Sequence, residues 1–66
     1  MPYATVEDLP ASVQAHLPLH AQEIYRAAFN AAFSKYPARE DIAHRVAWAA
    51  VKKRYRKEGP VWVERD

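Results

Sequence analysis

The residues best able to carry chemistry form a basic run near the end of the chain. Five of the ten lysines and arginines fall between Lys52 and Lys57, with Tyr55 among them. On a continuous helix, Arg45, Lys52 and Arg56 line up within about 40° of arc. Such a row can contact successive phosphates or an acidic protein surface, although a short charge run is more often a solvated helix end. The candidate contacts for an anionic partner are Arg45, Lys52, Lys53, Arg56 and Lys57.

Other reactive residue types do not form a recognisable catalytic or metal site. A single glycine cannot build a phosphate-binding loop. Asp41 and His44 stand three residues apart, which is half of a helical metal site, but the further pairs that such sites need are missing. A local salt bridge beside a helix start is therefore the favoured interpretation. Pro18 separates His16 from His20. We predict no catalytic residue, no cofactor and no metal.

Length and composition indicate one small domain, residues 1–66. The chain has no cysteine, so no disulfide or thiol chemistry is available, which fits a reducing cytoplasm. No secretory leader or membrane span is visible, and we expect a cytoplasmic protein. Residues 34–66 carry nine Lys or Arg against five Asp or Glu, a net charge of +4, whereas residues 1–33 carry a net charge of −2. This asymmetry favours an anionic partner for the second half.

The elements that must position the basic run begin with a helix predicted over residues 39–57. Its apolar residues recur at helical spacing, alanine is frequent and neither glycine nor proline interrupts it. Ile42 and Val46 lie on one face with two alanines, and most of the circumference is apolar. We therefore expect this helix to be central, with Val46 packed against Phe29 in the core.

Two more helices are predicted ahead of the central one. A short helix over residues 9–17 presents Leu9, Val13 and Leu17 on one side, and Pro18 ends it. A second helix over residues 19–36 is amphipathic and stops at Pro37.

The end of the chain is expected to fold back. Gly59 and Pro60 end the central helix, and residues 61–63 alternate as a strand does. We predict a two-stranded ribbon that pairs residues 4–6 with 61–63. Either this tail covers the Trp48 edge of the central helix, or that edge stays open for a partner; we favour cover, with Trp62 largely buried.

Five segments, taken together, are similar to a known family. They are Met1-Pro2-Tyr3, Leu9-Pro10, Leu17-Pro18, Ala21-Gln22-x-Ile24-Tyr25-x-x-Ala28-Phe29-Asn30 and Ala43-His44-x-Val46-Ala47-Trp48-Ala49-Ala50-Val51-Lys52. The sequence resembles the ChaB family of small bacterial proteins essentially from end to end. The resemblance implies a mostly helical domain that regulates a sodium/calcium–proton antiporter. It also implies viral relatives, some discussed as nucleic-acid binders, and brings no catalytic residues.

The expected function is that of a non-enzymatic, cytoplasmic interaction module. The first partner is another protein, such as the cytoplasmic face of a membrane transporter, with the module itself a monomer or a weak homodimer. The alternative is a nucleic-acid-binding protein that uses the basic end of the central helix. A metal-dependent enzyme ranks below both, because no converging set of ligands is apparent.

Overall fold

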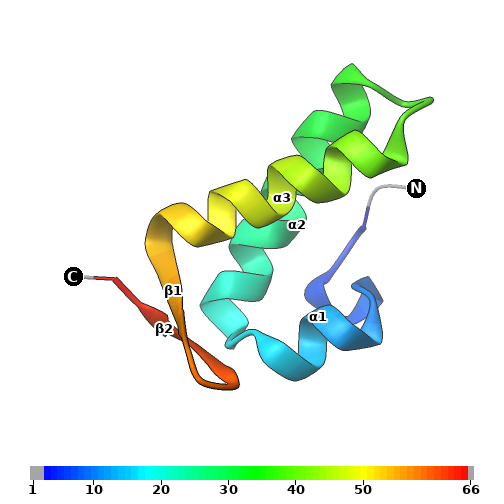
Figure 1. Ribbon diagram of the computed structural model, residues 1–66. Coiled ribbons are helices and arrows are strands. Elements are labelled where there is room, and N and C mark those ends of the chain that lie inside the picture. The colour runs from blue at the N-terminus through cyan, green and yellow to red at the C-terminus, as the bar shows by residue number, and fades with distance from the viewer. Residues whose placement is uncertain (1–2, 66) are drawn as a thin grey trace.

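Three α-helices followed by a two-stranded ribbon make up the part of the chain that the structure describes (Figure 1). The computed structural model describes residues 3–65. After the 3₁₀ turn η1 (Val6–Asp8) come α1 (Ala11–His16), α2 (Leu19–Lys35) and α3 (Glu40–Arg54). The strands β1 (Tyr55–Glu58) and β2 (Val61–Glu64) complete the order. The predicted class, mainly helical with a small two-stranded ribbon, is confirmed.

The two long helices, α2 and α3, are packed against each other and hold the other elements. Pro18 precedes α2, which ends at Lys35 with Tyr36 as its C-cap. Pro37 comes next, and proline disfavours helical geometry in the residue before it. Residues 36–39 then turn the chain into α3. Glu40 and Asp41 occupy the first turn of α3, and three basic residues occupy its last turn. Both ends therefore complement the helix dipole.

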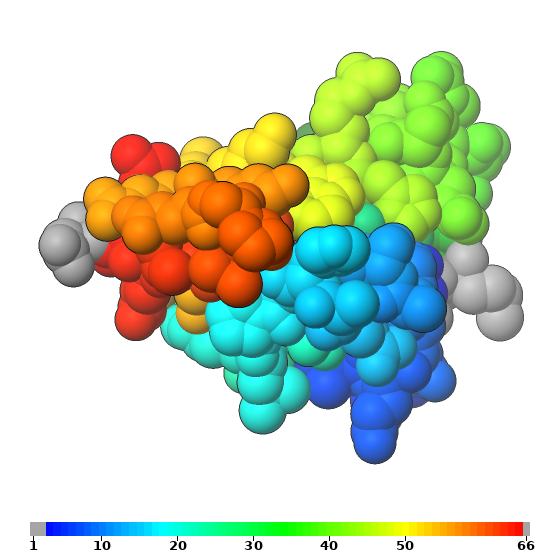
Figure 2. Space-filling view, turned by 60° about the horizontal axis from the view of Figure 1, so that its bottom comes forward, coloured from blue at the N-terminus to red at the C-terminus, as the bar shows by residue number. Residues whose placement is uncertain are grey.

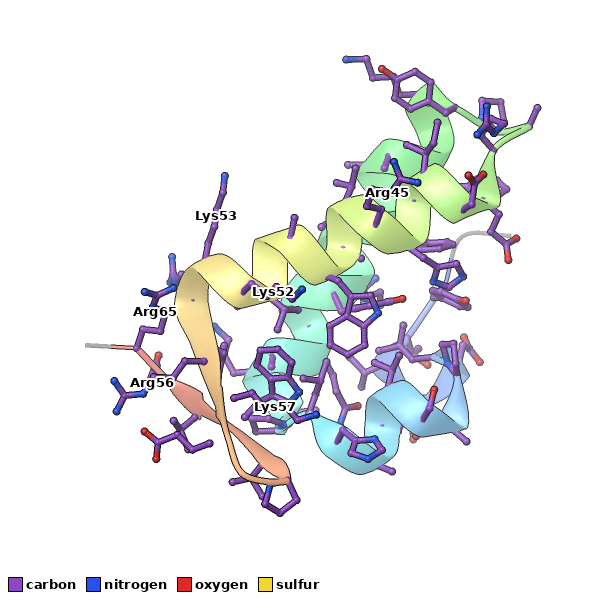
Figure 3. All side chains as sticks on the ribbon, viewed as in Figure 1. Arg45, Lys52, Lys53, Arg56, Lys57 and Arg65 are labelled. Atoms are coloured by element: carbon purple, nitrogen blue, oxygen red, sulfur yellow. The ribbon has the colours of Figure 1, made fainter. Side chains whose placement is uncertain are left out.

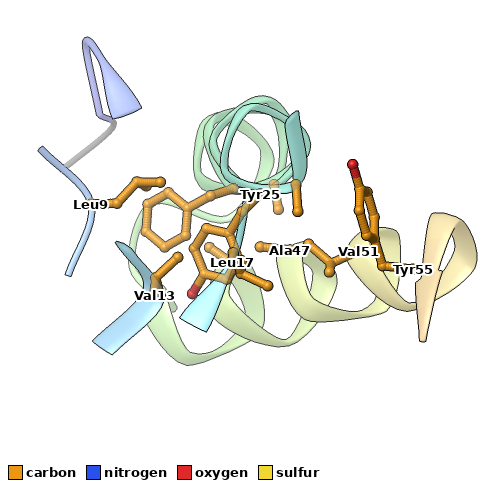
Figure 4. Close-up of a cluster of buried hydrophobic side chains, with 11 residues drawn as sticks. Leu9, Val13, Leu17, Tyr25, Ala47, Val51 and Tyr55 are labelled. Atoms are coloured by element: carbon orange, nitrogen blue, oxygen red, sulfur yellow. The ribbon is translucent and has the colours of Figure 1, made fainter. Parts of the chain in front are cut away.

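The core lies between α2 and α3 and extends under α1 (Figure 4). Each long helix buries residues at steps of three or four positions, which is the spacing of one helix face. The predicted face of the first helix is confirmed, since Leu9, Val13 and Leu17 are all buried. The buried apolar side chains of the described residues are Leu9, Val13, Leu17, Ala21, Tyr25, Phe29, Ala32, Ala43, Ala47, Val51 and Tyr55.

The predicted contact between Val46 and Phe29 is wrong. Val46 is 41% exposed, whereas the neighbouring Ala47 is fully buried. The ring of Phe29 instead lies 4.7 Å from the ring of His44, centroid to centroid. The α3 face that points inward is thus rotated by about one residue step from the predicted one, roughly 100°.

The predicted end of the central helix and the predicted partner of the tail also need correction. Helix α3 stops at Arg54, and residues 55–57 continue as strand β1. β1 pairs with β2 in an antiparallel ribbon, with Tyr55 opposite Glu64 and Glu58 opposite Val61. Gly59 adopts a φ of 62°, a left-handed conformation that glycine allows at little cost, within the two-residue turn. The tail therefore pairs with its immediate neighbour.

Residues 4–6 form no strand and are held by side chains instead. The amide of Asn30 accepts a hydrogen bond from the Tyr3 nitrogen at 2.8 Å and donates one to the Tyr3 carbonyl at 2.9 Å. The Asp8 carboxylate accepts from the Thr5 nitrogen at 3.2 Å, so it caps η1. The first helix starts only after Pro10, at Ala11. Asn30 thus fixes this N-terminal segment to α2.

Candidate functional site

The predicted anion-binding residues are all exposed and gather mostly at one end of the molecule (Figure 3). Lys52 and Lys53 occupy the last turn of α3, and Arg56 and Lys57 belong to β1. Arg45 lies about two turns earlier on α3. We call Lys52, Lys53, Arg54, Arg56, Lys57 and Arg65 the basic end.

The straight row predicted along one helix face does not form, because the chain leaves the helix before Arg56. Successive residues of a strand point to opposite faces. In the ribbon, Lys57 is paired with Trp62 and shares the face of the buried Tyr55, whereas Arg56 lies on the other face. Figure 3 shows the Arg56 and Lys57 side chains pointing apart. Only Arg45 and Lys52 keep the predicted alignment on α3.

The charges of the basic end differ in how far other groups satisfy them. Arg56 forms an ion pair with Glu58, with 2.7 Å between Nη2 and Oε2. Arg65 donates from Nη1 to the Lys52 carbonyl at 3.0 Å, and its backbone nitrogen donates to the Arg54 carbonyl at 2.8 Å. Arg65 thus caps the end of α3 and adds a cation that sequence reasoning missed. Its distance along the chain hid it, since only the ribbon register brings it back to the helix.

A shallow groove of about 470 Å³ opens beside the basic end. Ile24 of α2 and Val46 of α3 form its apolar walls together with two alanines, and Lys53 and Arg54 lie at its rim. Sequence reasoning placed Val46 in the core and therefore missed this groove. The apolar character of most of the α3 circumference was the available signal, because one helix and a ribbon cannot cover all of it.

The residues considered for metal binding take other partners. Asp41 pairs with Arg39 at 3.0 Å, and this hydrogen bond lowers the pKa of the Asp41 carboxyl group. His44 lies 3.6 Å from Glu40, between Nε2 and Oε2, and its Nδ1 is 2.5 Å from the Tyr25 hydroxyl. The predicted Asp41–His44 salt bridge is thus replaced by two separate pairs. Within residues 3–65, no three His, Cys, Asp or Glu side chains converge on one point.

The chain is similar to known proteins in both sequence and fold. The family model of ChaB matches residues 9–65. This chain belongs to the ChaB family. It is 52% identical to the "Putative cation transport regulator ChaB" of Escherichia coli K12, with 86% of this chain and 87% of the relative covered. The equally named proteins of Escherichia coli O157:H7 and Shigella flexneri match with the same identity and coverage.

A solved structure of a ChaB protein has the same fold. It is the NMR solution structure of "the putative cation transport regulator ChaB", and it superposes with a TM-score of 0.86 at 44% sequence identity. The match covers 98% of this chain and 100% of the other. The family resemblance stated from the sequence is therefore confirmed along nearly the whole chain.

The Trp48 edge of this ChaB-family fold is covered by the ribbon, as favoured from the sequence. The rings of Trp48 and Trp62 lie 5.8 Å apart, and the Trp48 ring also meets Tyr25 edge-on at 5.3 Å. Trp62 is half-buried, which is less than the predicted burial. Figure 2 shows the ribbon, in orange and red, closing one end of the molecule beside the start of α2. There the Tyr55 hydroxyl lies 3.1 Å from His20 Nδ1.

Across residues 3–65 of this ChaB-family chain, no helix combines the length and the apolar character needed to cross a membrane. The arrangement as a whole offers exposed cations and an apolar groove, which are means of binding another molecule.

Proposed function

We propose that this ChaB-family protein is a non-enzymatic, cytoplasmic binding module that regulates a sodium/calcium–proton antiporter. It does so by contacting an acidic segment on the cytoplasmic face of the transporter. The shared name of its relatives, "Putative cation transport regulator ChaB", supports the transport part of this proposal. The observation that carries the binding part is the clustering of exposed cations at the basic end.

The electrostatics of the basic end favour an acidic protein surface. Among residues 3–65, Lys52, Lys53 and Lys57 form no ion pair with a carboxylate, so their charges are available. Exposed charges attract an oppositely charged partner from about a Debye length, roughly 8 Å at physiological salt. Complementary charges mainly raise the association rate and set the orientation of the complex.

A vesicle assay tests the proposal. Everted membrane vesicles that contain the antiporter of the same host would be measured for cation–proton exchange, with and without added protein. We expect the protein to change the exchange rate in a saturable and salt-sensitive way. Lys52→Glu and Lys57→Glu should each shift the half-saturating concentration upward about fivefold, because a reversed exposed charge costs on the order of 1 kcal/mol.

Lys35→Glu is the matched control for these variants. It makes the same change in net charge at an exposed site at the far end of α2. It should leave the half-saturating concentration near that of the unmodified protein. An exchange rate that the protein never changes, or equal losses in all three variants, would contradict the proposal.

The nucleic-acid alternative rested on a straight row of Arg45, Lys52 and Arg56, and this row is not formed. Affinity capture from extract of the native cell separates the two functions, because nuclease treatment releases partners held through nucleic acid only. We expect the captured partner to survive nuclease treatment and to be released by salt.

A further inference from the structure

The groove between α2 and α3 lies on a helix face that the fold itself leaves uncovered. Helix α3 has three apolar sides. One side, with Ala47 and Val51, is buried against α2, and the Trp48 side is covered by the ribbon. The third side carries Val46, which is 41% exposed, and two alanines that line the groove.

The spacing of the groove residues suits another helix. On α3, positions 46, 49, 50 and 53 follow the i, i+3, i+4, i+7 pattern that packs ridges of one helix into grooves of another. Alanine side chains at 49 and 50 let a second backbone approach closely. Ile24 of α2 supplies the opposite wall. Helices α2 and α3 therefore already supply two members of a three-helix packing, and the groove is the place where a third helix would lie.

The charge at the groove rim points to an acidic occupant. Lys53 and Arg54 lie at the rim, and no carboxylate of the described residues lines the groove or pairs with either cation. By contrast, Arg39 and Arg56 at other sites each have a carboxylate partner. Figure 3 shows Lys53 projecting from the last turn of α3, away from the ribbon.

We propose that the groove binds an amphipathic helix of the partner protein, antiparallel to α3, with carboxylates in its first turn over Lys53 and Arg54. This proposal rests on the proposed function, in which the protein acts by binding another protein. The antiparallel direction places the positive N-terminal dipole of the incoming helix at the negative C-terminal end of α3. Acidic residues are also the ones that stabilise the first turn of a helix, so one arrangement satisfies both chains.

The test uses the whole protein with isotope-labelled methyl groups and a designed peptide of about 18 residues. The peptide has an apolar stripe at helical spacing and glutamates in its first turn. Two further peptides serve as probes: one with lysines replacing those glutamates, and one with the same composition in scrambled order. We expect the acidic peptide to shift the methyl signals of Ile24, Val46, Ala49 and Ala50. The lysine peptide should bind at least about fivefold more weakly, and the scrambled peptide should leave these signals unchanged.

Matched valine variants locate the site. Val46→Glu should weaken binding of the acidic peptide at least about fivefold, because it places a charge in the apolar groove. Val61→Glu makes the same change at a 52% exposed valine on the ribbon and should not affect binding. Amide spectra of both variants establish that they remain folded.

Several outcomes would overturn the proposal. These are equal binding of the scrambled peptide, equal losses in both valine variants, or shifts confined to the ribbon. Groove signals that change on dilution without peptide would mean that a second copy of the chain occupies the groove. Shifts produced only by phosphatidylglycerol vesicles would mean a lipid surface. The peptide experiment contains no transporter, so a negative peptide result does not contradict the proposed regulation of the antiporter. Likewise, a negative vesicle assay does not contradict peptide binding in the groove.

Discussion

At the scale of single residues, Tyr25 joins the core to a titratable pair at the surface. Its ring is 1% exposed and stacks with Phe29, with ring centroids 6.3 Å apart. Burial raises the pKa of Tyr25 to about 12, and the charge of ionised Tyr3 adds to this shift. The hydroxyl therefore keeps its proton, and it forms a hydrogen bond with Nδ1 of His44. His44 in turn presents Nε2 to Glu40.

This burial predicts a loss of stability at alkaline pH. An unfolded tyrosine ionises near pH 10.0 and folded Tyr25 near 12, so the unfolded chain loses its proton first as the pH rises. The contribution of Tyr25 is complete below pH 10 and should fall by roughly 2–3 kcal/mol as the pH approaches 12. Urea unfolding at pH 8, 10 and 11 measures the first part of this fall, which should reach roughly 1.4 kcal/mol by pH 11.

Tyr25→Phe is the control for this prediction. It removes the titrating group while keeping the ring, so its stability should depend less steeply on pH in the same window. Parallel pH profiles for the two proteins would show that the other tyrosines or the lysines cause the loss.

At the scale of elements, the inward face of α3 decides which substitutions unfold the protein. Ala47→Asp places an unpaired carboxylate at a fully buried position, at a cost of several kcal/mol, which is comparable to the whole stability of a small domain. Val46→Asp lies in the exposed groove and should change stability by less than about 1 kcal/mol. Helicity and thermal melting of the two variants give the comparison. A folded Ala47→Asp variant would refute the observed packing.

The ribbon is expected to stabilise the helices on which it packs. A chain that ends at Gly59 loses β2, the contact of Trp62 with Trp48 and the cap that Arg65 places on α3. Removing the half-buried Trp62 alone should cost roughly 1–2 kcal/mol, so the melting temperature should drop by several degrees. Val61→Ala, at an exposed position of the same strand, should have little effect. If the truncated chain and the full chain have the same melting temperature, the ribbon contributes nothing to stability.

The helices could be predicted from the sequence because their signals are local. Proline boundaries and apolar spacing fixed α1 and α2 to within about two residues at each end. The face of α3 could not be predicted in the same way. Alanines lie on several faces of this helix, so its apolar pattern does not distinguish one face clearly. The larger Val46 therefore led to the prediction that its face is buried. Only the position of α2 and of the ribbon decides which alanines are covered.

The end of α3 was hidden because lysine and arginine are good helix formers. The stronger signal was the pair Gly59-Pro60 between two short segments, which is the length of a hairpin loop. Because Gly59-Pro60 was interpreted only as the end of a helix, strand β1 was not predicted and Arg56 was assigned to the helix. The division of these basic residues between two faces of a ribbon was therefore not predicted.

At the scale of the whole molecule, most of the labelled basic side chains lie at the end formed by the last turn of α3 and the ribbon, where we propose that a partner binds (Figure 3). The body measures 33 × 21 × 15 Å, so a partner that contacts the basic end also reaches the groove rim. Lys53 and Arg54 belong to both the basic end and the groove. A partner with an acidic helix and an acidic loop could engage both at once.

The arrangement of the His, Asp and Glu side chains among the described residues predicts that divalent metals do not stabilise the protein. Zinc, manganese or calcium at millimolar concentration should leave the melting temperature unchanged, because the described residues supply no converging ligand set. Calorimetry provides a second measurement. A stoichiometric site of sub-micromolar affinity would return Asp41 and His44 to consideration as ligands.

The contact between Trp48 and Trp62 gives the protein an optical reporter of its own. The chain has only these two tryptophans, and they lie 5.8 Å apart across the interface between α3 and the ribbon. Their emission should therefore report whether the ribbon is docked, without any dye or engineered label. A partner that enters the groove acts on another side of α3 and should leave the emission unchanged. A partner that pulls the ribbon from the helices should alter its wavelength and intensity at once.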